Sequence, residues 1–165
     1  MIPALRSDHA GEAGAVAIYR GILALSRDDS VREFAQHHLA TEEHHLEIME
    51  QLVQPTHRSR LLSVWRFAGW ITGALPALFG ANAVFRTIDA VETFVELHYS
   101  EQIERLRKRP EDRELCSLLE QCCADEVMHR NEARSQLGAP SLTGRCWAAM
   151  VGLGSRVGVY LACRI

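Results

Sequence analysis

Two short motifs of the form Glu-x-x-His, far apart in the chain, constrain the fold of this sequence more than any other feature. One contains Glu42 and His45, and the other contains Glu126 and His129. Residues three apart lie on one face of an α-helix, so each pair can bring a carboxylate and an imidazole to one point. A single glutamate in apolar surroundings precedes each motif at a similar interval. The pattern therefore predicts two similar helix pairs.

The remaining sequence also has helical periodicity, and the alternation typical of strands is almost absent. Four long helices are expected, together with apolar helical segments. The long helices are expected at about Asp8–Leu25, Ser30–Leu52, Asn82–Lys108 and Pro110–Leu137, and a last apolar helix from Thr143 to the C-terminus. Short connections between antiparallel neighbours favour a four-helix bundle.

Local signals predict where several helices begin and end. Ser30 and Glu33 have the spacing of a capping box at a helix start. Pro110 suits the first position of a helix. Gly138, followed by Pro140, is typical of a left-handed cap at a helix end.

An apolar stretch between residues 67 and 85 contains no charged side chain. Its length could span a bilayer, but Pro76 and three glycines favour two shorter pieces. We expect residues 61–86 and 143–165 to form apolar helices that associate with a membrane surface, with Trp65, Trp70 and Trp147 near the headgroups. The alternative is that these segments are ordinary core or a subunit contact.

A bundle of two helix pairs would bring four glutamates and two histidines to its centre. A carboxylate on an apolar face is costly to bury unless it is paired or bound to a metal. Single glutamates from two helices and Glu-x-x-His from the other two form the di-metal pattern of ferritin-like bundles. These ligands suit iron or manganese, and we prefer iron because carboxylates can shift with its redox state. The sequence therefore predicts an all-α, ferritin-like four-helix bundle with two additional apolar helices, as one domain over residues 1–165.

The net charge, the cysteines and the other histidines bear on which classes of function and site are expected. A net charge of -3 argues against nucleic-acid binding. The five cysteines contain no C-x-x-C motif, so neither a disulfide framework nor a thiolate zinc site is expected. Four histidines are expected on the surface, namely His37, His38, His44 and His57. His9 and His98 lie near the expected cluster of four glutamates and two histidines, and spacing alone assigns them no role.

Several motifs resemble those of the demethoxyubiquinone hydroxylases, the di-iron monooxygenases of ubiquinone biosynthesis. In chain order they are Asp8–Ala15 with Ile18 and Tyr19, Ala90–Glu92 with Leu97–Tyr99, Asp125–His129 and Arg156–Leu161. The resemblance extends from Arg6 to Ile165. Three positions depart from the family pattern, Ala13, Leu97 and Cys163, and none of them is a proposed ligand.

The resemblance implies a specific activity and specific site residues. It implies iron ligands at Glu12, Glu42, His45, Glu92, Glu126 and His129, with Glu42 and Glu126 bridging two iron ions. It places His98 and Tyr99 near the quinone. The implied reaction is the O2-dependent hydroxylation of the ring of a polyprenylated demethoxy-benzoquinol, that is, a 3-demethoxyubiquinol hydroxylase with NADH as electron source. No Gly-x-Gly-x-x-Gly motif indicates a nucleotide domain in the chain itself.

The implied substrate also predicts where the protein works. A prenyl tail stays in the bilayer, so we expect a peripheral protein on the cytoplasmic face of a bacterial cell membrane. The matrix face of the mitochondrial inner membrane is the alternative, which the missing transit segment disfavours. The resemblance further implies a lipid-binding companion and a quinone-synthesis complex. The length of the prenyl tail stays open. The oligomeric state also stays open, and a homo-oligomer is one alternative.

Two other functions fit parts of the pattern. A ferritin-like ferroxidase or iron-binding bundle would use the same ligands in a soluble assembly, and the long apolar segments argue against it. A non-catalytic membrane-associated helical bundle would bind no stoichiometric metal.

Overall fold

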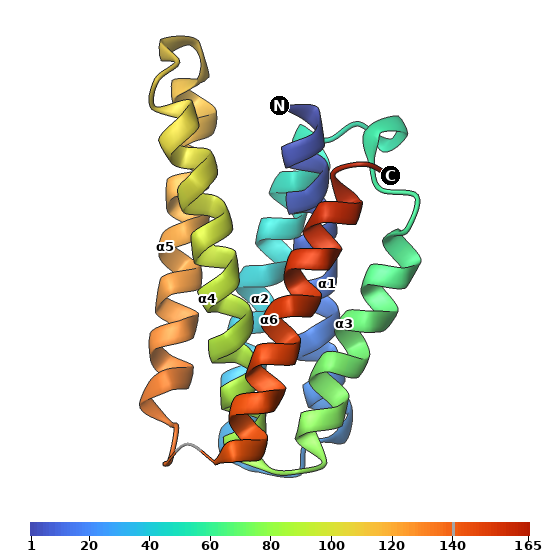
Figure 1. Ribbon diagram of the computed structural model, residues 1–165, viewed down its shortest axis with the longest axis vertical. Helices are drawn as coiled ribbons and strands as arrows, with labels where there is room; N and C mark the ends of the chain where they lie inside the picture. The colour runs from blue at the N-terminus through green and yellow to red at the C-terminus, as the bar shows by residue number, and fades with distance from the viewer. Residues whose placement is uncertain (140) are drawn as a thin grey trace.

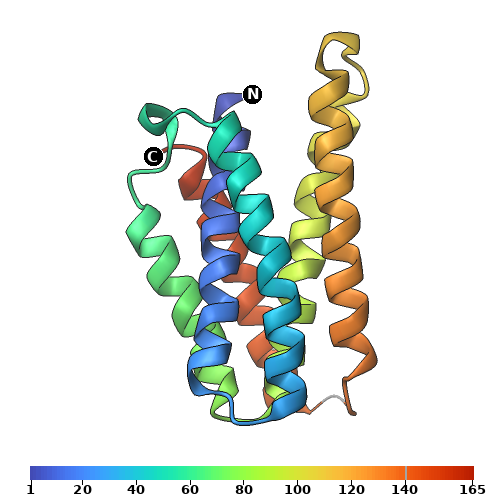
Figure 2. The same ribbon diagram turned by 180° about the vertical axis from the view of Figure 1, so that it is seen from behind.

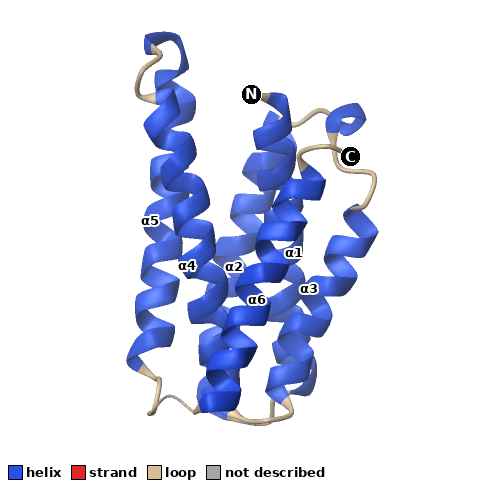
Figure 3. Cartoon of the chain, viewed as in Figure 1, coloured by secondary structure: helices blue, strands red, loops and turns tan. Residues whose placement is uncertain are grey.

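The computed structural model describes residues 1–139 and 141–165. Six α-helices form nearly all of this part of the chain, and it contains no β-strand (Figure 3). The helices are α1 Ile2–Leu25, α2 Asp29–Leu52, α3 Leu62–Ala77, α4 Ala81–Leu106, α5 Arg113–Ser135 and α6 Leu142–Ala162, with short 3-10 turns at Pro55–His57 and Pro110–Asp112. The predicted all-α class is confirmed.

The helices form two antiparallel pairs with two further helices along one side. α1 packs against α2, and α4 packs against α5 (Figures 1 and 2). α3 lies along α1, while α6 contacts both α4 and α1. The arrangement is the predicted ferritin-like four-helix bundle with two additional apolar helices. None of the helices in the described residues combines the length and apolar character that crossing a bilayer requires.

The predicted ends of several helices are wrong in detail. α1 begins at Ile2 and not at Asp8, and Pro110 begins a 3-10 turn before α5, which starts at Arg113. The cap of α2 is Asp28 and not Ser30, because Asp28 Oδ1 accepts hydrogen bonds from the amides of Ser30 and Val31 at 3.0 and 3.2 Å. Gly138 is not a left-handed cap either: the chain leaves α5 through a tight turn, and the Gly138 amide donates to Asn82 Oδ1. Pro140, expected beyond that cap, lies outside the described residues.

The apolar stretch divides into two pieces, as its Pro and Gly residues predict. α3 ends at Ala77 and α4 begins at Ala81. Gly80 connects them at a φ of 91°, a left-handed conformation that glycine adopts without strain.

Glycines allow α3 to approach α1 closely. A Cβ atom at Gly69 would overlap the backbone of Gly14, and one at Gly73 would overlap the carbonyl oxygen of Ile18. A side chain at either position would therefore force the two helices apart. The contact holds α3 against the outer side of α1, where it becomes one wall of the cavity described below.

The core consists of two apolar clusters at different levels of the bundle. The first includes Tyr19, Ile22, Phe34 and Ile88, and the second includes Met49, Tyr99, Ile103 and Leu119. Each helix of the four-helix bundle carries one of these four glutamates, between or beside the apolar positions: Glu12, Glu42, Glu92 and Glu126. The glutamates therefore sit in an interior that disfavours charge. The five cysteines are free thiols in the described residues.

Candidate metal centre

Six side chains predicted as ligands converge at the centre of the bundle. None of them is more than 4% exposed. They form two groups, Glu12, Glu42, His45 and Glu126, and Glu42, Glu92, Glu126 and His129, and within each group the ligand atoms lie within 4.8 Å of one another. Because Glu42 and Glu126 occur in both groups, the cluster offers two adjacent cation positions with two shared carboxylates.

The Glu-x-x-His spacing aims both histidines inward. His45 Nδ1 lies 3.0 Å from Glu126 Oε1, and His129 Nδ1 lies 3.1 Å from Glu42 Oε1. Each contact joins α2 to α5 across the bundle. His129 Nδ1 also lies 3.3 Å from Glu126 Oε2. The inward Nδ1 atoms and the carboxylate oxygens are thus the groups that an ion at this point would meet.

Burial and crowding change the pKa values of the six side chains. Burial raises the pKa of Glu12, Glu42 and Glu92, and the charge of Glu126 raises them further. Burial opposes ionisation of Glu126 as well, but hydrogen bonds from His129 and His45 outweigh it and lower its pKa to about 2.

The two histidines respond in the opposite direction. Burial acts to lower their pKa, but hydrogen bonding to Glu126 and the surrounding carboxylates raise it to about 10 for His45 and about 9 for His129. Without a metal, the cluster therefore holds protons that two cations would displace.

The residues fit a pair of divalent cations. Within the described residues, Glu42 Oε2 is buried without a hydrogen-bond partner. Buried unpaired carboxylate oxygens are costly, and coordination to a cation would satisfy them. Four carboxylates would balance the charge of two divalent ions, and oxygen with imidazole ligands suits iron or manganese.

Three further side chains hold the candidate ligands in place. The Tyr99 hydroxyl donates to Glu12 Oε1, and the Tyr19 hydroxyl donates to Glu92 Oε1 at 3.4 Å. Burial raises the pKa of both phenols, so both remain donors. Asp125 Oδ2 lies 3.1 Å from His45 Nε2 and so fixes the outer side of that ring. Residue spacing assigns no role to Tyr19 or Asp125, although both belong to the motifs that resemble the hydroxylases.

The prediction that His38 lies on the surface is wrong. The His38 ring is fully buried, with its centroid 4.1 Å from that of His129, and its Nε2 lies 3.0 Å from Glu132 Oε2. Burial, followed by the charge of His129, lowers its pKa to about 3. The reason is helical register, because a residue four before Glu42 shares its inner face.

The other histidines have clear positions. His37 and His44 are exposed, as predicted, and His57 is half-buried. His9, which spacing left unassigned, is buried 3.9 Å from Glu50 and joins neither group of candidate ligands.

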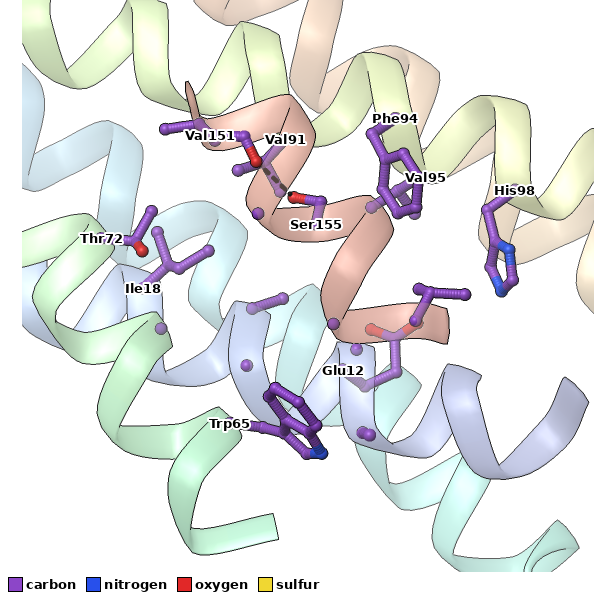
Figure 4. Close-up of a pocket in the computed structure, with 18 of the residues that line it drawn as sticks. Glu12, Ile18, Trp65, Thr72, Val91, Phe94, Val95, His98, Val151 and Ser155 are labelled. Atoms are coloured by element: carbon purple, nitrogen blue, oxygen red, sulfur yellow. Dashed lines mark hydrogen bonds between the residues drawn. The ribbon is translucent and has the colours of Figure 1, made fainter. Parts of the chain in front are cut away.

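A cavity of about 300 Å³ opens beside the cluster. Its walls come from α1, α3, α4 and α6 and are mostly apolar, and all four cluster glutamates border it. Figure 4 shows Glu12, Trp65, Phe94 and Val151 around this space. A hydrophobic molecule in the cavity would therefore meet the carboxylates at one side.

His98 borders the same cavity and is held by a buried carboxylate. Asp8 Oδ1 lies 2.9 Å from His98 Nε2 and accepts a hydrogen bond from Gln102 Nε2 at 2.7 Å. The Asp8 side chain is inaccessible to solvent, and that of His98 is partly exposed. Asp8 therefore fixes the orientation of the His98 ring at the cavity.

Comparison with known proteins identifies the family. A family model for the ubiquinone biosynthesis protein COQ7 matches residues 2–162. The chain belongs to the COQ7 family. It is 34% identical over 169 residues to the 3-demethoxyubiquinol 3-hydroxylase of Rhodospirillum rubrum, covering 98% of this chain and 76% of that protein.

Two other relatives are similar to this chain. One is the mitochondrial NADPH-dependent 3-demethoxyubiquinone 3-hydroxylase of Homo sapiens, 30% identical over 98% of this chain and 76% of the human protein. The other is the 3-demethoxyubiquinol 3-hydroxylase of an Azoarcus species, 32% identical over 98% of this chain and 77% of that protein. The family resemblance found from sequence motifs is confirmed.

Proposed function

We propose that this COQ7-family chain is a 3-demethoxyubiquinol 3-hydroxylase that acts at a di-iron centre. Family membership and the names of relatives from bacteria and mitochondria support the reaction. The observation that carries the proposal is that six buried ligand-type side chains border a largely apolar cavity. The alternative of a ferroxidase is not favoured, because iron alone does not need an apolar cavity of this size.

The proposed ligands divide between two iron ions. Glu12 and His45 would hold one ion, Glu92 and His129 would hold the other, and Glu42 and Glu126 lie within reach of both. When bound, the iron pair supplies the activation of dioxygen for ring hydroxylation. Asp125 and the two tyrosines keep the ligand side chains oriented, so little reorganisation is needed when metal binds.

The cavity would hold the quinol ring, with the apolar walls excluding water. His98 would contact a ring oxygen, and Asp8 would set the direction of its imidazole. Tyr99 donates to Glu12 and borders the cavity, so it links the ring-binding space to one proposed ligand.

The prenyl tail would leave the cavity toward a membrane surface. α3 and α6 carry many exposed apolar side chains, among them Phe67, Ile71, Met150, Leu153 and Tyr160. An amphipathic helix with such a face can lie in the bilayer interface. We therefore propose that residues 61–86 and 143–165 attach the protein peripherally, at the cytoplasmic face of a bacterial membrane.

A reduced nicotinamide nucleotide would supply the electrons. The human relative is named NADPH-dependent, whereas the sequence resemblance predicts NADH. Assays of the iron-loaded protein with each nucleotide in turn would distinguish the two.

The deciding experiment measures metal content and turnover together. The protein would be loaded with Fe(II), its iron measured, and hydroxylation of a demethoxyubiquinol followed by mass spectrometry. Glu126→Ala removes a shared carboxylate and should lower both iron content and turnover by more than tenfold. Glu114→Ala, which removes an exposed carboxylate from the same helix, should leave both unchanged. Full turnover by Glu126→Ala would refute the proposed site.

A further inference from the structure

A second cavity, of about 400 Å³, lies at the end of the molecule where α3 ends and α4 and α6 begin. This is the lower end of the view in Figure 1. Trp147 borders both cavities, but none of the six candidate iron ligands lines this one. Its polar side is formed by Asn82, Arg86, Ser141 and Thr143. The family reaction assigns no role to this space.

Arg86 is a buried cation that has no counter-ion among residues 1–139 and 141–165. Its side chain borders the cavity, and the residue is only 9% exposed. Its one hydrogen bond in the described residues is from Nη2 to the carbonyl oxygen of Gly138, at the long distance of 3.5 Å. Its Nε atom has no acceptor, and no carboxylate of the described chain forms an ion pair with it. A buried charge in this state is unfavourable until an anion meets it.

The start of α6 adds a second positive feature at the same place. The Ser141 side chain accepts from the Gly144 amide, while the first amides of a helix have no acceptor within the helix. Together with the helix dipole, they give the N-terminus roughly half a positive charge. A Cβ atom at Gly144 would lie 2.8 Å from Arg86 Cδ and 2.9 Å from Nε, so the arginine packs directly on this turn.

We propose that this cavity binds a phosphate group between Arg86 and the first turn of α6. A guanidinium matches the oxygens of a phosphate, and a helix N-terminus presents amides to an anion. The side chains of Asn82 and Thr143 lie at the same cavity and add hydrogen-bonding groups. The phosphate can belong to a phospholipid headgroup or be free in solution. The proposal does not depend on the iron ligands or on hydroxylation.

Binding is measured on the full chain with two probes. Inorganic phosphate is titrated by calorimetry, and vesicles of phosphatidylcholine alone are compared with vesicles that also contain phosphatidylglycerol. Phosphate binding identifies the free anion as a ligand. A preference for phosphatidylglycerol without phosphate binding identifies the headgroup. Attachment through the apolar faces of α3 and α6 would occur with both kinds of vesicle, so the difference between them reports the response to an anionic headgroup, and the variants below assign it to this site.

Two variants and a matched control locate the binding. Arg86→Gln removes the charge and should weaken phosphate binding, or the phosphatidylglycerol preference, by about tenfold or more. Gly144→Ala keeps the charge but displaces the arginine, so it should also weaken binding. This variant tests the proposal if Arg86→Gln does not fold. Arg145→Gln removes an exposed charge from the same turn and should change affinity by less than about twofold.

Three results would overturn the proposal. The wild-type protein could bind neither probe selectively. Folded Arg86→Gln, or Gly144→Ala, could bind as well as the wild type. Arg145→Gln could lose as much affinity as Arg86→Gln, which would indicate general attraction to a basic surface.

Discussion

At the scale of single residues, the candidate metal centre depends on side chains that are not themselves ligands. Asp125 is the clearest case, because its carboxylate contacts the outer nitrogen of His45 at 3.1 Å. Such a contact selects the tautomer of the ring and directs its inner nitrogen toward the ion. Asp125→Asn should therefore weaken metal binding. Because the Asp125 side chain is partly exposed, we expect a loss of roughly tenfold, the lower end of the usual range.

Competition with a chelator of known affinity measures this loss. Asp89→Asn serves as the control, since it removes one carboxylate from an ion pair with Arg134 that lies outside the cluster. Equal metal affinity of Asp125→Asn and the wild type would show that the contact does not orient His45.

At the scale of helices, the cavity depends on how closely α3 approaches α1. Gly73→Ala would place a Cβ atom against the carbonyl oxygen of Ile18, a backbone atom that cannot move away without shifting the helix. We expect a loss of stability of about 1–3 kcal/mol, the usual range for overpacking a tight contact. Thermal unfolding of the variant measures it.

Gly152→Ala is the matched control on α6. No heavy atom lies within 4 Å of a Cβ built there, and alanine favours helix over glycine by about 1 kcal/mol. This variant should therefore be as stable as the wild type or more stable. If Gly73→Ala behaved in the same way, the glycine contact would not limit the packing of α3 on α1.

At the scale of the whole molecule, the buried cluster couples folding to pH and to metal. The pKa values of His45 and His129 are raised in the folded protein, to about 10 and about 9, from an unfolded value near 6.5. The folded state then binds more protons, so the stability they contribute is complete below about pH 6.5 and is lost as the pH rises toward 9–10. The raised pKa values of Glu12, Glu42 and Glu92 act in the same direction.

Metal-free protein should therefore melt at a lower temperature at pH 8 than at pH 6.5. Manganese-loaded protein should melt higher at both pH values and lose most of this dependence, because bound ligands have already released their protons. Melting curves with a chelator and with Mn²⁺ at the two pH values test this prediction. An unchanged melting temperature of the metal-free protein between them would contradict it.

Local sequence signals predicted the elements and most of the candidate site. Helical periodicity gave the number of helices, and the i, i+3 spacing in both Glu-x-x-His motifs depends on one helix alone. A single glutamate precedes each Glu-x-x-His motif at a similar interval, and this repeat predicted that the two helix pairs meet around the six side chains. The motifs also carried the family resemblance, which comparison with COQ7 proteins confirmed.

Other features depended on contacts between distant segments, which no local pattern encodes. The contacts of His38 with Glu132 and His129 exist only because α5 packs against that face of α2, and Asp125 matters because α2 brings His45 to it. Arg86 meets the start of α6 only after the chain has folded back along α4. The sequence by itself therefore determined the helices and which residues share a helix face. The tertiary structure decided which side chains meet, since burial and charge pairing depend on neighbours from other helices.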